Sequence, residues 1–111
     1  MATNSYKNAM AISVGTSLVD VYTCPGATVA TVIGLCISNK TSDSVFVDVK
    51  IYDSSATATC FLIKQAPIPV GGSLVVIGGD QKVILEAGDK IQAQSETAAA
   101  LDIFVSLVQL A

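Results

Sequence analysis

The second half of the chain consists of apolar runs separated by glycine turns: Pro67-Ile-Pro-Val-Gly-Gly-Ser-Leu-Val-Val-Ile77, then Lys82-Val-Ile-Leu-Glu-Ala-Gly-Asp-Lys-Ile-Gln-Ala-Gln94, and finally Leu101-Asp-Ile-Phe-Val-Ser-Leu-Val-Gln-Leu110. Apolar residues recur at every second position: Val83 and Leu85, Ile91 and Ala93, then Leu101, Ile103, Val105 and Leu107. In a pleated strand this spacing places them on one face. The pattern predicts a meander of short strands that buries this face in a small sandwich or barrel.

The rest of the chain continues the pattern at short, even spacing. Strands are predicted at about 11–14, 17–24, 29–38, 44–53, 59–65, 73–77, 82–86, 89–95 and 101–110. Polar hairpin loops are predicted at 39–43 and 54–58, between β-prone runs. We therefore expect an all-β fold, a single-domain antiparallel β-sandwich of jelly-roll or Ig-like type with 8–9 short strands. Residues 1–10 are polar and form an N-terminal arm in this scheme, and residues 11–111 form the domain.

The composition leaves little solvated surface. Of the 111 residues 51% are hydrophobic and only 14% are charged, against roughly 25% charged in an average soluble domain. An apolar surface of this kind is typical of a protein that packs against other proteins. We expect a homo-oligomer, with a trimer as the first choice, or a subunit embedded in a larger assembly.

Two strands carry apolar side chains on both faces. From Val45 to Asp53, valine and isoleucine alternate with Phe46, Asp48, Lys50 and Tyr52. The last strand places Phe104, Val108 and Leu110 opposite its aliphatic stripe. Because aromatic residues are enriched in interface cores, the second faces are predicted to meet another protein. The candidate interface residues are Phe46, Tyr52, Phe104, Val108 and Leu110.

The sequence lacks the residues that most catalytic sites require. There is no histidine, so neither a Ser-His-Asp nor a Cys-His arrangement can form. The nine acidic residues fall mostly in turns or on outer strand faces, and Gly78-Gly79-Asp80 and Gly88-Asp89 match turns better than calcium loops. We expect a protein that is not an enzyme, with no catalytic residues, no cofactor site and no metal site.

Charge and hydropathy exclude two further classes of partner. The net charge is −3, and the six lysines are scattered with no arginine beside them, so binding to nucleic acid is not expected. The longest apolar stretch, 27–38, is too short to cross a membrane as a helix. The first residues do not resemble a secretory signal, so we expect the protein to stay in the compartment where it is made.

The three cysteines are spaced 12 and 24 residues apart, which matches no zinc motif. Cys24 precedes Pro25 at a strand end, whereas Cys36 and Cys60 alternate with apolar neighbours inside predicted strands. We interpret all three as reduced thiols that serve as small hydrophobic side chains. On this interpretation Cys36 and Cys60 are buried.

A series of motifs resembles the small β-rich structural proteins of tailed bacteriophage virions, of the type found in marine and cyanobacterial phages. The series runs from Tyr22-Thr-Cys-Pro25 through Thr31-Val-Ile-Gly-Leu-Cys-Ile-Ser-Asn39 and Val47-Asp-Val-Lys-Ile-Tyr-Asp53 to Leu101-Asp-Ile-Phe-Val-Ser-Leu107. Its most specific part is the Pro-x-Pro, Gly-Gly-Ser-Leu and Leu-Glu-Ala-Gly-Asp-x-Ile sequence between residues 67 and 91. The likeness covers residues 20–110.

The resemblance implies a non-enzymatic building block of the virion, assembled in the host cytoplasm. Its partners would be further copies of itself and other virion proteins such as the major capsid protein, which it would decorate or cement. The alternative is a neck, tail or fibre accessory subunit with a receptor- or carbohydrate-binding role. Sugar-binding platforms usually expose several aromatic rings, and this chain has no tryptophan and three tyrosines.

Overall fold

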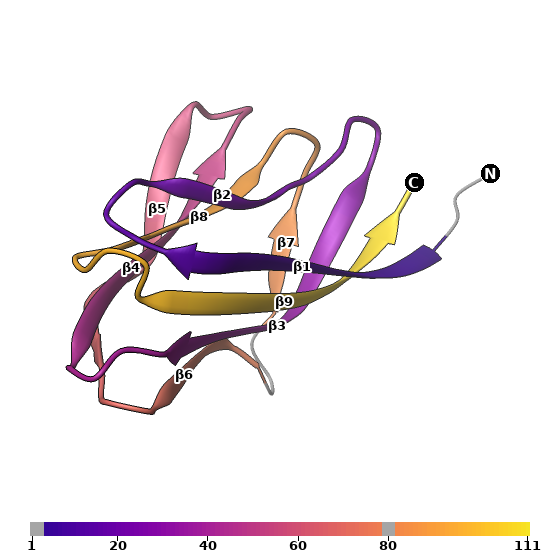
Figure 1. The fold of residues 1–111 in the computed structure, drawn as a ribbon. Coiled ribbons are helices and arrows are strands. Elements are labelled where there is room, and N and C mark those ends of the chain that lie inside the picture. The colour runs from indigo at the N-terminus through magenta and orange to yellow at the C-terminus, as the bar shows by residue number, and fades with distance from the viewer. Residues whose placement is uncertain (1–3, 79–81) are drawn as a thin grey trace.

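A computed structural model describes residues 4–78 and 82–111, which fold into two antiparallel sheets packed face to face (Figure 1). Sheet A contains β1 (Asn4–Val14), β9 (Leu101–Leu110), β3 (Val29–Asn39) and β6 (Ser73–Ile77) in that order, and β7 (Val83–Leu85) also pairs with β3. Sheet B contains β2 (Val19–Thr23), β8 (Lys90–Ser95), β4 (Val45–Asp53) and β5 (Ala58–Ile68). The predicted all-β sandwich and its strand number are confirmed.

The strand order is that of a jelly roll rather than a meander. Among the described strands, β4 and β5 are the one consecutive pair that is hydrogen-bonded, and the other neighbours in each sheet are distant in sequence. The hairpin predicted at 54–58 is therefore confirmed. The hairpin predicted at 39–43 is wrong, because this loop carries the chain from β3 in sheet A to β4 in sheet B.

Asn39 explains why the chain leaves sheet A at this point. Its buried side-chain Nδ2 donates to the carbonyl oxygens of Asp43 and Ile68, each at 2.9 Å. Its Oδ1 accepts from the N–H of Thr41 at 2.9 Å. A buried amide satisfied in this way holds a fixed corner, which directs the chain toward sheet B.

The core lies between the two sheets and is built from the stripes that the alternation predicts. Leu101, Ile103, Val105 and Leu107 of β9 all lie inside, opposite the stripe of β4 that begins at Val45. A β-bulge in β3 between Val32 and Gly34 shifts this alternation, so Ala30 and Val32 point inward before it and Leu35 and Ile37 after it.

The first strand is longer than predicted. Residues 4–10, assigned to the arm, lie in β1, which pairs with β9 from Asn4↔Leu110 onward. Residues 1–3 lie outside the described part of the chain. Among the described residues the structure contains no helix with the length and apolar character needed to span a membrane.

Candidate functional site: the outer face of sheet A

The outer face of sheet A carries two apolar rows that cross the strands. In the first row the register places Met10 of β1 beside Phe104 of β9, then Cys36 of β3 and Val75 of β6. All four side chains are exposed. Because opposed side chains on one sheet face are direct neighbours, this row forms a continuous apolar ridge.

The second apolar row lies toward the other end of the strands. It runs from Tyr6 through Val108 and Thr31 to Ile84 of β7. Beyond it Val29 lies beside Leu110, and both are exposed. We call the surface formed by the two rows and their apolar neighbours the sheet A face: Tyr6, Met10, Ile12, Val29, Ile33, Cys36, Val75, Ile84, Phe104, Val108 and Leu110.

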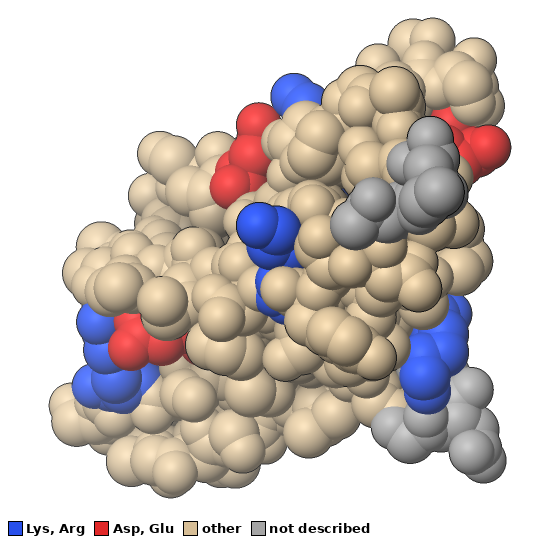
Figure 2. All heavy atoms as spheres, turned by 90° about the vertical axis from the view of Figure 1, so that its right-hand side faces the viewer, with Lys and Arg blue, Asp and Glu red and all other residues tan. Residues whose placement is uncertain are grey.

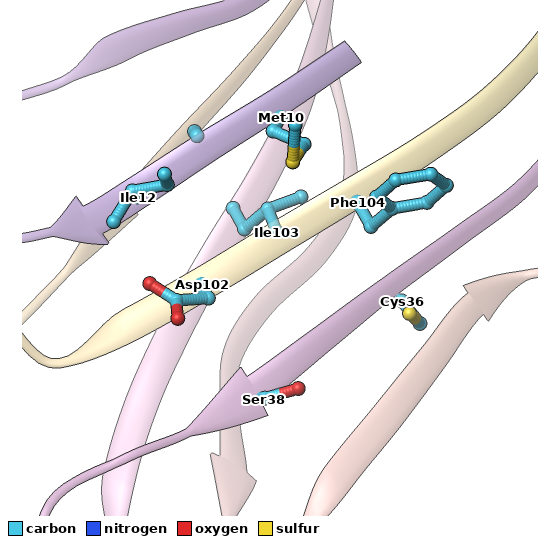
Figure 3. Close-up of a pocket in the computed structure, with 8 residues that line it drawn as sticks. Met10, Ile12, Cys36, Ser38, Asp102, Ile103 and Phe104 are labelled. Atoms are coloured by element: carbon cyan, nitrogen blue, oxygen red, sulfur yellow. The ribbon is translucent and has the colours of Figure 1, made fainter. Parts of the chain in front are cut away.

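Phe104 is at the centre of this surface, 42% exposed and surrounded by shallow hollows. A row of small residues, Asn8, Ser106 and Gly34, separates the two apolar rows and provides the floor of two of the hollows. The third, of about 210 Å³, lies beside Met10 and Ile12. Figure 3 shows the Phe104 ring over β9, between Met10 on β1 and Cys36 on β3. A raised ring among hollows is suited to interdigitate with a complementary surface.

Asp102 marks the border of the sheet A face. Its Oδ1 accepts a hydrogen bond from the Ser13 N–H at 2.9 Å and lies 3.0 Å from Lys40 Nζ. The hydrogen bond from Ser13 and the positive charge of Lys40 lower the pKa of Asp102. The carboxylate therefore stays ionised and paired at the rim, where charged groups are common in protein interfaces.

The outer face of sheet B is polar by comparison. The register places Asp20 beside Gln92, Gln92 beside Lys50, and Lys50 beside Phe61. The Lys64 Nζ lies 4.6 Å from the centre of the Phe61 ring. Charges spread over a face in this way favour contact with water, so the two outer surfaces of the sandwich differ in kind.

The structure separates the predicted interface residues into two groups. Phe104, Val108 and Leu110 lie together on the sheet A face. Phe46 and Tyr52 lie on sheet B, where Phe46 lines a hollow with Asp48, Gln65, Gln94 and Glu96. Strands β1, β3, β6 and β7 also contribute to the sheet A face, and their residues were not among the predicted interface residues. For β1 the sequence holds a signal: Tyr6, Met10 and Ile12 all occupy even positions, which places them on one face of a strand.

Charged side chains form small, separate groups on the side of the molecule that Figure 2 presents. Lysines lie near acidic side chains in places, and uncharged atoms cover most of this view. On this side of the molecule the described residues form no continuous basic stripe of the kind that nucleic-acid-binding proteins carry.

One group of carboxylates lies close enough together to share a cation within residues 4–78 and 82–111. One oxygen from each of Asp53, Glu86 and Asp89 lies within 4.8 Å of the others. Asp89 is buried, and its carboxylate accepts from the N–H of Ser54 at 3.0 Å and from the N–H of Glu86 at 2.9 Å. These hydrogen bonds satisfy the buried carboxylate, and they link the loop after β4 to the turn before β8. Of the other predicted turn, Gly78-Gly79-Asp80, residues 79 and 80 lie outside the described residues.

The cysteine interpretation requires a correction. Cys24 is 1% exposed, and its thiol donates to the Thr28 carbonyl oxygen at 3.3 Å, but Cys36 and Cys60 are exposed. The bulge at Gly34 turns Cys36 outward, and Cys60 lies on the edge strand β5. All three thiols are free. Burial raises the pKa of the Cys24 thiol, which further lowers its reactivity.

We expect a thiol reagent to modify two cysteines of the native protein, Cys36 and Cys60, and to reach Cys24 only on unfolding. Mass spectrometry after labelling with and without denaturant measures this directly. Cys36→Ser and Cys60→Ser variants would each lose one fast-reacting site. Rapid labelling of Cys24 in the native protein would contradict the assigned burial.

Comparisons with known proteins give a likeness of fold. No protein-family model and no curated protein sequence matches the chain. A chain from the acid-stable capsid structure of the Helicobacter pylori bacteriophage KHP30 is similar, with a TM-score of 0.58 at 9% identity over 97% of this chain and 92% of that one. A chain from the disulfide-linked pili of Bacillus endospore appendages has a TM-score of 0.50 at 13% identity over 98% of this chain and 85% of that one.

Proposed function

We propose that this protein is a non-enzymatic structural subunit of a bacteriophage virion, which decorates or cements the capsid through protein–protein contacts. The observation that carries the proposal is the sheet A face, an apolar surface centred on Phe104 on a small jelly roll. Contiguous exposed apolar surfaces mark interaction sites in soluble proteins. The jelly roll is common among capsid proteins, and the fold likeness to a phage capsid chain supports the same role.

In the proposed role the sheet A face packs onto the capsid shell, and the polar face of sheet B points outward. The virion would be assembled in the host cytoplasm, from many copies of this chain and of the major capsid protein. The phage type, marine or cyanobacterial, stays a prediction from the sequence. Interface chemistry agrees with the orientation, because a phenylalanine surrounded by aliphatic side chains, with an ion pair at the rim, resembles the core-and-rim plan of stable interfaces.

Mass spectrometry of purified particles, with and without tails, tests the role. We expect the protein in tailless capsids at a copy number comparable to that of a shell component. Its presence only in tailed particles would favour the neck or tail alternative. Its absence from both would contradict a virion role.

A second candidate, the subunit of a protein filament, is favoured by one observation. Two exposed free thiols, Cys36 and Cys60, lie on different sheets, and a similar fold occurs in disulfide-linked pili. Gel electrophoresis of native assemblies without reductant distinguishes the candidates. A ladder of covalently linked chains would favour the filament, and single chains would favour the capsid subunit.

A further inference from the structure

Strand β1 is an open sheet edge of unusual regularity. Within the described residues it pairs on one side, with β9, in a register that is unbroken from Asn4 to Ala11. Figure 1 shows β1 as the outer strand of its sheet, next to β9. Over this length it contains a single charged residue, Lys7, and no proline. An edge of this kind exposes backbone donors and acceptors that can pair with another strand.

The other edge strands carry the features that block such pairing. In β5 the register with β4 is broken at two places, Gln65 has a φ of 52°, and Lys64 and Pro67 lie in the strand. In sheet A, β6 has five residues, and in sheet B, β2 has five residues with a shifted register and the charged Asp20. Bulges, charges, proline and short length are the usual protections of an edge. Between Asn4 and Ala11, strand β1 has no break in register and no proline, and Lys7 is its one charge.

We propose that β1 pairs antiparallel with β1 of a second copy of this chain, about a two-fold axis centred on Asn8. A two-fold axis is the operation that sets a strand antiparallel to its own copy. The pairing would join two sheets A into one continuous sheet, and it would place two sheet A faces side by side. It is an additional contact that does not depend on the proposed capsid role.

Charge and side-chain fit select the register. In an antiparallel pair, opposed side chains point to the same face of the sheet. Each residue of β1 can therefore oppose only a residue of the second copy whose number differs from its own by an even amount. The two-fold axis then passes through a residue and not between two residues. An axis at Lys7 would place Lys7 directly opposite Lys7 of the second copy, and two like charges in this position repel each other. An axis at Asn8 places Lys7 beside Ala9 of the second copy and Tyr6 beside Met10 of the second copy, a favourable sulfur–aromatic contact. It also keeps residues 5–11 paired within the regular part of β1, whereas an axis at Ala9 would carry the overlap across the break in register between Ala11 and Val14.

The second copy is favoured over a strand of another protein because the edge is complementary to itself. Asn8 would meet Asn8 of the second copy, and two side-chain amides can each donate and accept. The exposed Tyr6 and Met10 would cover each other from both sides of the axis. The trimer expected from the sequence would have to form through a different surface.

Complementary charges at position 8 test the pairing. Asn8→Lys and Asn8→Asp each place two like charges at the axis, and we expect each variant to weaken the dimer by about fivefold or more. An equimolar mixture of the two variants is expected to form the mixed dimer, because opposite charges then meet. Native mass spectrometry, which separates the masses of the species, measures all three samples against the wild-type protein. Circular dichroism checks that each variant is folded.

A crosslink provides a measurement that does not depend on weakening the contact. In a Cys36→Ser, Cys60→Ser background, Asn8→Cys is expected to give a disulfide-linked dimer under mild oxidation. The matched control Ser5→Cys is expected to stay uncrosslinked. In this register position 5 lies opposite position 11 of the second copy, so the two positions 5 are six residues apart along the strands, roughly 20 Å. A wild-type protein that is monomeric at tens of micromolar would overturn the proposal. Equal crosslinking at positions 5 and 8 would also overturn it, as would wild-type dimer formation by both charged variants.

Discussion

Replacing Phe104 by alanine is expected to remove the protein from assembled particles while leaving the free chain folded. Phe104 is 42% exposed at the centre of the sheet A face, so the substitution removes little of the core of the free protein. At the centre of an interface, an aromatic anchor of this kind is worth about 2 kcal/mol or more, which is a loss of roughly thirtyfold in affinity. Quantitative mass spectrometry of particles grown with the variant measures its incorporation against that of the wild-type protein.

Phe46→Ala is the matched control. Phe46 has the same side chain and a similar exposed fraction, 44%, but it lies on sheet B in a hollow lined by polar and charged residues. If the sheet A face meets the shell, Phe46→Ala is expected to be incorporated normally. Loss of Phe46→Ala with normal incorporation of Phe104→Ala would place the interface on sheet B. Normal incorporation of both variants would contradict an aromatic anchor on either face.

Replacing Leu107 by alanine is expected to lower the free energy of unfolding by about 3 kcal/mol. Leu107 is 1% exposed in the central strand β9, where it faces Val32 across the sheet and packs into the core. The substitution removes buried apolar surface and leaves a cavity that a closely packed interior fills only in part. Against a typical total stability of about 5–15 kcal/mol, the loss is large. Urea unfolding monitored by circular dichroism measures it.

Leu110→Ala is the control for this prediction, because it changes the same residue type in the same strand. Leu110 is 46% exposed on the sheet A face, and an exposed substitution away from special features usually changes stability by about 0.5 kcal/mol or less. Equal losses for the two variants would contradict the assignment of the two faces of β9.

The alternation of apolar residues was sufficient to predict the strands and most of the core. In β9 the spacing of Leu101, Ile103 and Val105 repeats every second residue. The extra residues at its register shifts lie in the partner strands β1 and β3, so all three side chains lie inside. The same holds for Val45, Val47 and Val49 in β4. These stripes are local properties of an extended chain, so a sequence can reveal them without knowledge of the strand order.

Bulges and long-range pairing could not be predicted in this way. In β3 one extra residue near Gly34 reverses which side chains point inward, so the regular alternation placed Cys36 in the core when it lies outside. The crossing from β3 to β4 depends on the hydrogen bond from Asn39 to the Ile68 carbonyl, 29 residues away. Such contacts exist only once the two sheets are packed together.

The candidate surface was predicted in part for a related reason. Its centre, with Phe104, Val108 and Leu110, lies in one strand and was visible as a second apolar stripe. Its other members come from β1, β3, β6 and β7, and the strand order alone brings them beside β9. Tyr6 and Met10 were also assigned to a polar arm, because Asn8 interrupts the apolar alternation between them.

Thiol labelling of the protein in assembled particles tests the central claim most directly, because the chain carries one exposed cysteine on the sheet A face and one on sheet B. Cys36 lies beside Phe104, and Cys60 lies on β5. If the sheet A face packs against other virion proteins, we expect Cys36 to react in the free protein and to be protected in the particle, while Cys60 reacts in both. A Cys36 that reacts at the same rate in the particle as in the free chain would contradict the account.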